Sequence, residues 1–325
     1  MRSLQGSLAA LIIAAFGSVA PAPVCSQGYP TRPLRIIVPT SPGAGSDYAA
    51  RLISQPLSVR LGQQVIVDNR PGGGTMIGSE IVARSRADGY TLLAGGPSLA
   101  INPSIYKSVP YDALRDFAPI TQTISQSQVL VVHPSLPAKS VKELIVLAKA
   151  RPGDIVYGSA GQGSGPHLSM ELFLLLSGTR MLHIPYKGPA QAIVDLTAGR
   201  LSAQMFGITI SGSHIHAGRL RALGVTGAKR LVSLPDIPTI AEAGLAGYES
   251  TQWSGLLAPA GTPQDIIARL NREVTAVLNA QDIRERLAKE DVAVMAGSPD
   301  HFAAHIRAES AKWAKVVKSA GIQPE

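Results

Sequence analysis

Short apolar runs alternate with longer mixed runs along most of the chain after residue 27. The short runs are typical of buried strands and the longer runs of helices. Strands are predicted over 34–38, 65–69, 90–94, 129–132, 155–157, 181–185, 201–210, 220–225 and 253–258, and helices over 47–61, 75–85, 140–150, 167–176, 189–197, 264–278, 281–289 and 299–320. This alternation indicates an α/β fold with largely parallel sheets. Pro56 lies inside the first predicted helix and lacks a backbone donor, so we expect a kink or a break there.

A glycine-rich turn connects the first predicted strand to the first predicted helix. It reads Pro-Thr-Ser-Pro-Gly-Ala-Gly-Ser-Asp over residues 39–47, and Ser46 or Asp47 is the expected N-cap of the helix. A helix that opens directly after such a turn presents unpaired backbone N–H groups and the positive end of its dipole. The turn is therefore a candidate anion site.

The same arrangement recurs in the second half of the chain. The strand predicted at 155–157 runs into Gly-Ser-Ala-Gly-Gln-Gly-Ser-Gly-Pro at 158–166, and a helix follows from His167. Two such turns that face one cleft can hold the two ends of a small acid. The sequence therefore predicts a protein that binds small carboxylates, although each turn could also be a simple strand-to-helix connection.

The N-terminal residues have the pattern of a secretory signal peptide. A single early charge, Arg2, precedes an apolar stretch over 8–20, and small residues around Cys25 offer a cleavage site before Gln27. We expect residues 1–26 to be removed and the protein to be periplasmic. A buried N-terminal helix and a lipid-anchored Cys25 are the alternatives. Because Cys25 is the only cysteine, the mature chain would carry no disulfide or thiolate chemistry.

Charge and composition argue against nucleic acid as a partner. The formal charge is +8, but the basic residues are scattered, and aromatic residues make up only 5% of the 325 positions, too few for stacking platforms. A basic surface instead concentrates an anionic ligand by long-range attraction.

Motifs for catalysis, cofactors and metals are missing from the sequence. It has no G-x-S-x-G elbow and no zinc-helix signature, and the glycines between Gly72 and Gly78 lack the spacing of a nucleotide loop. We interpret that stretch as close packing at a helix start, and His214 and His216 as a solvated surface pair. No cofactor, metal or catalytic residue is expected, although a Ser/His/Asp set assembled only in three dimensions stays possible.

The chain is long enough for two domains with a cleft between them. Crossings are predicted near 125–129 and 250–253. Lobe 1 would then comprise residues 27–126 and 252–325, and lobe 2 residues 127–251.

Ordered motifs along the whole mature chain carry a family resemblance. They are Tyr-Pro-Thr-Arg-Pro-Leu-Arg-Ile-Ile-Val-Pro at 29–39, Val-Asp-Asn-Arg-Pro-Gly at 67–72, Ala-Asp-Gly-Tyr-Thr-Leu-Leu at 87–93, Ile-Asn-Pro at 101–103, Pro-Tyr-Asp at 110–112, Asp-Phe-Ala-Pro at 116–119, Val-His-Pro-Ser at 132–135, His-Ile-Pro-Tyr-Lys-Gly at 183–188 and Leu-Pro-Asp-Ile-Pro-Thr at 234–239. With these the chain resembles the Bug-type extracytoplasmic solute receptors, the substrate-binding proteins of tripartite tricarboxylate transporters. The resemblance implies a two-lobed type II periplasmic-binding-protein fold and ligands that are small carboxylic acids.

The resemblance also implies which residues meet the ligand. By position these are Thr40, Ser41, Gly43, Ala44, Gly45, Ser46 and Asp47 in the first lobe, Ser98 and Ala100 at the pocket edge, and Ser159, Gly161, Gly163, Ser164, His167 and Gly207 in the second lobe. The chain departs from the family where Thr40 and Ser41 replace an aromatic residue and a proline, and where Gly207 replaces an aspartate. We hypothesise a ligand that lacks an ammonium group near residue 207 or is bulky enough to need the space.

The expected partners are a small organic acid and membrane transporter subunits, bound by a monomer that closes its lobes around the ligand. Two alternatives remain at this point: a receptor that hands its closed form to a sensor protein, and an enzyme on the same fold.

Overall fold

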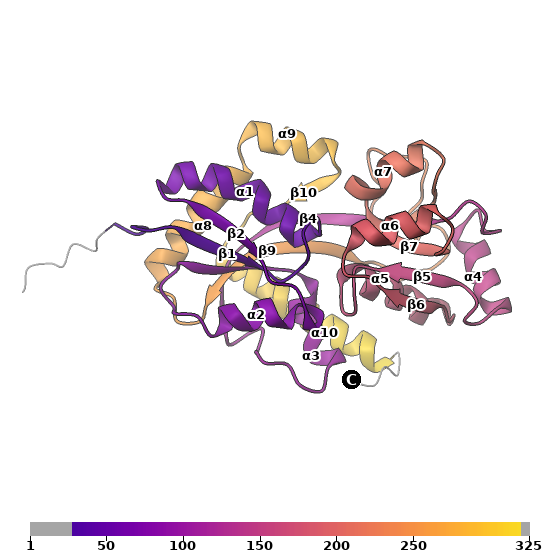
Figure 1. The fold of residues 1–325 in the computed structure, drawn as a ribbon, viewed down its shortest axis with the longest axis horizontal. Coiled ribbons are helices and arrows are strands. Elements are labelled where there is room, and N and C mark those ends of the chain that lie inside the picture. The colour runs from indigo at the N-terminus through magenta and orange to yellow at the C-terminus, as the bar shows by residue number, and fades with distance from the viewer. Residues whose placement is uncertain (1–27, 320–325) are drawn as a thin grey trace, which may run out of the picture.

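The computed structural model describes residues 28–319 as two lobes, each built from a β-sheet with helices packed on it (Figure 1). The predicted signal peptide, with Cys25, lies outside the described residues. The strands are β1 Leu34–Val38, β2 Val65–Asn69, β3 Thr91–Gly95, β4 Phe117–Val132, β5 Val156–Ser159, β6 Leu182–Pro185, β7 Ala203–Gly207, β8 Arg221–Val225, β9 Thr251–Pro259 and β10 Val292–Val294. The helices are α1 Gly45–Leu61, α2 Met76–Ala83, α3 Pro97–Ile105, α4 Val141–Ala150, α5 Gly165–Ser177, α6 Pro189–Thr197, α7 Ile208–His216, α8 Gln264–Leu278, α9 Gln281–Lys289 and α10 Pro299–Ser319, with a short 3₁₀ turn, η1, at Gly73–Thr75.

One long strand, β4, connects the two halves of the sheet. The strand order is β2-β1-β3-β9-β4-β7-β5-β6, with β8 and β10 also paired to β4. Residues 117–127 of β4 pair with β9, whereas residues 128–132 pair with β7 and β8. The parallel pairs β1–β2, β1–β3, β5–β6 and β5–β7 lie on either side of this antiparallel centre. The switch in pairing partner falls inside the crossing predicted at 125–129.

Separate apolar clusters fill the two halves. One buries Ile36, Leu57 and Leu270 between the first sheet and helices α1 and α8. Another contains Leu130 and Phe173 in the second half. This second cluster also includes Ile101 and Ile105 of α3 and Trp313 and Val317 at the end of α10, so it connects the two halves.

Several element boundaries differ from the sequence prediction. Helix α1 runs unbroken through Pro56, because buried Leu52, Ile53 and Leu57 hold it to the core on both sides of the proline. The strand predicted over 201–210 ends at Gly207, and its last three residues begin α7. Strand β4 begins twelve residues before the predicted 129, and α3 and β10 were not predicted. Strand β4 and helix α3 contain prolines and polar residues whose burial depends on packing against distant segments, and β10 is only three residues long.

None of the helices described in residues 28–319 is sufficiently long and apolar to cross a membrane.

Candidate functional site

The first glycine turn ends in a helix start that the Asp47 side chain organises from within. The helix begins at Gly45, so the N-cap position belongs to Ala44, and the prediction of Ser46 or Asp47 as N-cap was wrong. Asp47 is the third helical residue, and its carboxylate accepts hydrogen bonds from Gly43 N at 2.9 Å, Arg51 Nε at 3.0 Å and Asn69 Nδ2 at 2.9 Å. The carboxylate therefore fixes the turn. The first N–H groups of the helix, like those of any α-helix, have no intrahelical partners.

The pKa of Asp47 reflects this setting. Burial alone would raise it, but the hydrogen bonds from Arg51, the Gly43 N–H and Asn69 outweigh burial, and the pKa lies below its ordinary value. Gly43 has a φ of +81°, a left-handed conformation that glycine adopts without strain.

The second glycine turn also has glycines with positive φ directly before a helix. Histidine side chains on the side away from the cavity support it. Ser164 is the N-cap of α5, and Gly161 and Gly163 have φ values of +120° and +68°. The N–H of Gly163 donates to Nδ1 of His167 at 3.2 Å, which requires the neutral ring with its proton on Nε2. The His167 ring stacks on His183 with 4.2 Å between centroids.

Burial sets the charge of this histidine pair. It lowers the pKa of His167 to about 3, with a further contribution from His183, and it lowers the pKa of His183 to about 4. His183 Nε2 lies 2.7 Å from Ser159 Oγ, and Glu171 accepts a hydrogen bond from Tyr157 on the far side. Both histidine rings are therefore neutral at physiological pH.

Both turns open into one cavity of about 820 Å³. Eleven of the fifteen residues proposed from the sequence line it: Thr40, Ser41, Gly43, Ala44, Gly45, Ser46, Asp47, Ser98, Gly161, Ser164 and Gly207. The other four lie behind its wall. Ala100 is in the core, Ser159 is fully buried against His183, and Gly163 and His167 bond to each other.

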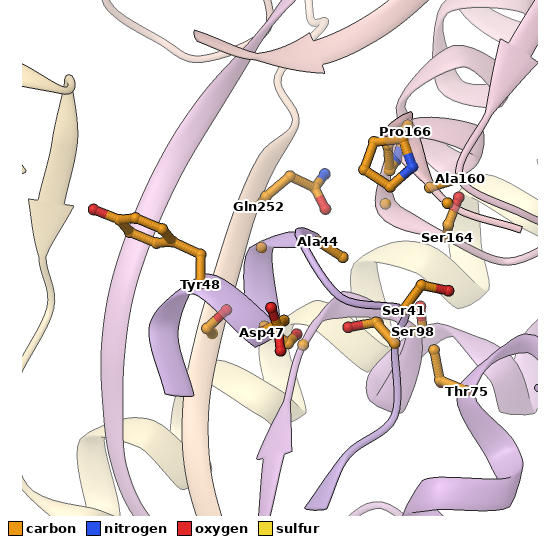
Figure 2. A pocket seen from close by; sticks show the side chains of 18 of the residues that line it. Ser41, Ala44, Asp47, Tyr48, Thr75, Ser98, Ala160, Ser164, Pro166 and Gln252 are labelled. Atoms are coloured by element: carbon orange, nitrogen blue, oxygen red, sulfur yellow. The ribbon is translucent and has the colours of Figure 1, made fainter. Parts of the chain in front are cut away.

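Two hydroxyl groups on the cavity wall lack partners. Thr40 Oγ1 and Ser164 Oγ are buried and have no hydrogen-bond partner among the described residues. One comes from each lobe, and both residues line the cavity. A buried hydroxyl without a partner costs free energy, so these two are groups that a bound ligand would satisfy. Figure 2 shows Ser164 and Ser41 on facing sides of the cavity.

The two lobes contact each other near the glycine turns. Ser41 Oγ donates to the carbonyl of Lys187, and Ser98 Oγ donates to the carbonyl of Gly163 at 2.6 Å. Each bond joins a first-lobe side chain to a second-lobe loop. The lobes are therefore in direct contact here through two hydrogen bonds from side chains to backbone carbonyls.

Several cavity residues were not proposed from the sequence. The glutamines Gln126, Gln128 and Gln252 come from the connecting strands, and Thr75 from the turn before α2. Gln126 and Gln128 are two residues apart and so share one face of β4, a period-two signal that the sequence did offer. Thr75 has a φ of +80°, a strained conformation for a β-branched residue that costs about 1–3 kcal/mol and is common at functional sites.

The glycines between Gly72 and Gly78 divide into two kinds. Gly72, Gly73 and Gly74 line the cavity. Gly78 packs so closely that a Cβ there would lie 2.8 Å from the carbonyl oxygen of Arg70 and from Pro39 Cα. The interpretation as close packing at a helix start is thus confirmed for Gly78 alone.

His214 and His216 lie in the last turn of α7, where His216 is exposed. Within residues 28–319 no three His, Cys, Asp or Glu side chains come together as metal ligands would.

Sequence and structure comparisons give the family. The family model of the tripartite tricarboxylate transporter family receptor, TctC, matches residues 49–322. The chain belongs to this family. Protein BugT from Bordetella pertussis is 38% identical over 302 residues, which cover 92% of this chain and 93% of BugT.

Two solved structures extend the comparison. A structure described as R. palustris Rpa4515 with adipate has 39% sequence identity and a TM-score of 0.86, and it covers 91% of this chain and 100% of that one. MatC from Rhodopseudomonas palustris with bound malate has 28% identity and a TM-score of 0.82, and it covers 89% and 100%. The periplasmic-binding-protein fold and the role of a solute receptor for a transporter follow from these comparisons.

Proposed function

We propose that this receptor binds an organic carboxylate in the cavity between its two glycine turns. The observation that carries the proposal is the convergence of two helix N-termini, α1 and α5, with two unpartnered hydroxyls, Thr40 and Ser164, on one cavity. Helix N-termini and hydroxyl groups both donate hydrogen bonds, and helix N-termini also bind anions. The adipate and malate that the two solved relatives hold are acids of this kind.

The charges on the cavity wall favour an anion. The wall carries Arg51, Lys187 and Arg286 against a single carboxylate, Asp47, and Arg51 already pairs with that carboxylate at 3.0 Å. The remaining polar groups are hydroxyls and amides. An amino acid would bring an ammonium group into a wall that has no free carboxylate to receive it.

Export and lobe closure complete the proposal. Residues 1–26 act as a signal peptide that directs the chain to the periplasm, and the lobes divide where β4 changes partner, between Ser127 and Gln128, and where β9 begins. Closure over the acid presents the surface that membrane subunits of the transporter recognise.

One buried pair resembles a catalytic arrangement but suits a structural role. Ser159 Oγ and His183 Nε2 are 2.7 Å apart, as in a nucleophile and its base. Ser159 is fully buried, however, and neither residue lines the cavity. A substrate in the cavity would not reach this hydroxyl, so we infer binding without turnover.

Calorimetric titration of the purified protein with organic acids, the matching neutral amides and amino acids tests the proposal. We expect acids to bind and the amides and amino acids to fail. Thr40→Val and Ser164→Ala should each weaken binding about three- to tenfold, because each removes a hydrogen bond worth about 0.5–1.5 kcal/mol.

Two matched controls separate binding from folding. Thr275 and Ser233 also carry buried, unpartnered hydroxyls, but neither lines the cavity. Thr275→Val and Ser233→Ala should therefore leave affinity unchanged. Tight binding of an amide or an amino acid in place of the acids would contradict the proposal.

A further inference from the structure

The cavity is much larger than a short diacid needs. A non-hydrogen atom of a ligand takes no more room than a water molecule, about 30 Å³. An acid of about nine such atoms then fills at most about a third of the 820 Å³. The remaining space must belong to a larger ligand or stay filled with water.

The space away from the glycine turns has apolar walls from both lobes. Tyr48 and Leu52 line it from α1, Ile124 from β4, Phe206 from β7 and Ile210 from α7. Figure 2 shows Tyr48 pointing away from Ser41, Ser98 and Ser164, the polar groups of the two turns. We call this part of the cavity the apolar chamber. These side chains suit hydrocarbon and offer little to a carboxylate, and of the five Tyr48 and Ile210 expose the most surface.

A positively charged side chain, Arg286, lies beside the apolar chamber. Arg286, on α9, lines the cavity, and its guanidinium carbon lies 5.8 Å from the centroid of the Tyr48 ring. Its Nε contacts Glu290 at 3.1 Å, but the side chain is 57% exposed, and Glu290 does not line the cavity. Part of its hydrogen-bonding capacity therefore remains for an anionic group.

Gly207 directly follows Phe206 of the apolar chamber and lies close to Gln126, which also lies close to the first turn. Its φ of −62° suits any residue, and a Cβ there would meet only ordinary contacts, with Gln126 Oε1 at 3.6 Å and Thr209 Oγ1 at 3.7 Å. The Nε2 of Gln126 would in turn lie 3.1 Å from a Cβ built at Gly45, in the first turn. A side chain at 207 would thus project among cavity-lining groups. Glycine at this position leaves open a passage from the first turn to the apolar chamber.

We propose that the ligand is an elongated organic acid that extends through this passage. One carboxylate is held by the two glycine turns, an apolar body passes Gly207 into the chamber beside Tyr48 and Phe206, and a second anionic group faces Arg286. This assignment rests on the proposed function, because it assumes that the first carboxylate binds at the turns.

Titration of α,ω-dicarboxylates of four to ten carbons, and of monocarboxylates of the same lengths, tests the chamber. Each methylene that enters an apolar wall should tighten binding about fourfold, until the chamber is filled. Gly207→Leu should reduce the ratio of long-chain to short-chain affinity at least about tenfold, and Gly207→Ala should fall between it and the unmodified protein. Equal affinity along the series, or a Gly207→Leu variant that weakens the binding of all acids alike, would overturn the proposal that the ligand extends into the chamber.

A second pair of variants tests Arg286. Arg286→Gln should lower the preference for a long dicarboxylate over the monocarboxylate of the same length about tenfold, and Arg286→Lys should restore part of it. Arg284→Gln, on the same helix but outside the cavity, is the control. An unchanged preference in Arg286→Gln would overturn the role of Arg286. Failure of every acid, short and long, would instead refute the proposed function.

Discussion

Acid should loosen the second glycine turn through His167. The native ring must be neutral, because its Nδ1 accepts the Gly163 N–H, and a proton on that nitrogen would remove the bond. Protonation would also place charge against the stacked ring of His183, 4.2 Å away. Glu171 is the nearest compensating group, with 3.8 Å between its Oε1 and His167 Nε2, but burial raises the pKa of Glu171 and weakens that compensation in acid.

The magnitude follows from the pKa of His167, about 3 in the native protein and about 6.5 when unfolded. Between these values the unfolded ring holds a proton that the native ring does not, so stability falls as the pH falls. Each pH unit costs about 1.4 kcal/mol, and two units, from pH 6.5 to 4.5, cost about 2–3 kcal/mol. His183, with a pKa of about 4, acts in the same direction.

Urea unfolding at several pH values measures this loss. His167→Gln keeps an acceptor for Gly163 but has no titrating ring, so its stability should fall about 2–3 kcal/mol less than that of the unmodified protein between pH 6.5 and 4.5. His301→Gln, at an exposed position on α10, is the control and should follow the unmodified protein. Parallel curves for His167→Gln and the unmodified protein would refute the reasoning.

Three further substitutions test the packing of the site. Gly78→Ala should destabilise the fold by about 1–3 kcal/mol in thermal unfolding, because its Cβ would lie 2.8 Å from backbone atoms of Arg70 and Pro39; an unchanged midpoint would contradict that packing. Asp47→Ala should cost about 1–3 kcal/mol and weaken acid binding, since three donors lose a buried acceptor; the prediction fails if denaturant unfolding and titration both match the unmodified protein. Ser98→Ala removes the bond to the Gly163 carbonyl and should speed ligand dissociation about threefold or more in stopped-flow measurements; an unaltered rate would mean that this bond does not hold the lobes closed.

The sequence determined the local parts of this protein. Strand, glycine turn and helix follow one another within about fifteen residues at 34–47 and again at 155–167, and turn chemistry and helix starts depend on neighbours along the chain. The two turns and the alternation of elements were predictable for this reason. The family resemblance added the correct expectation that the turns belong to one two-lobed receptor.

Tertiary structure decided which side chains meet. Asp47 is a residue type common at N-cap positions. Its carboxylate instead accepts hydrogen bonds from the Gly43 N–H, earlier in the turn, and from Asn69, at the end of β2. His167 does not line the cavity; its ring stacks on His183, sixteen residues later in the chain.

Arg286 illustrates the same limit over a longer distance. It joins the cavity only because the chain returns to the first lobe after completing the second. Contacts between residues far apart in the chain depend on sheet order and helix packing, which local pattern does not specify. Local sequence therefore predicted the two glycine turns, while the size of the cavity and the residues that line it together, Arg286 among them, depend on the fold.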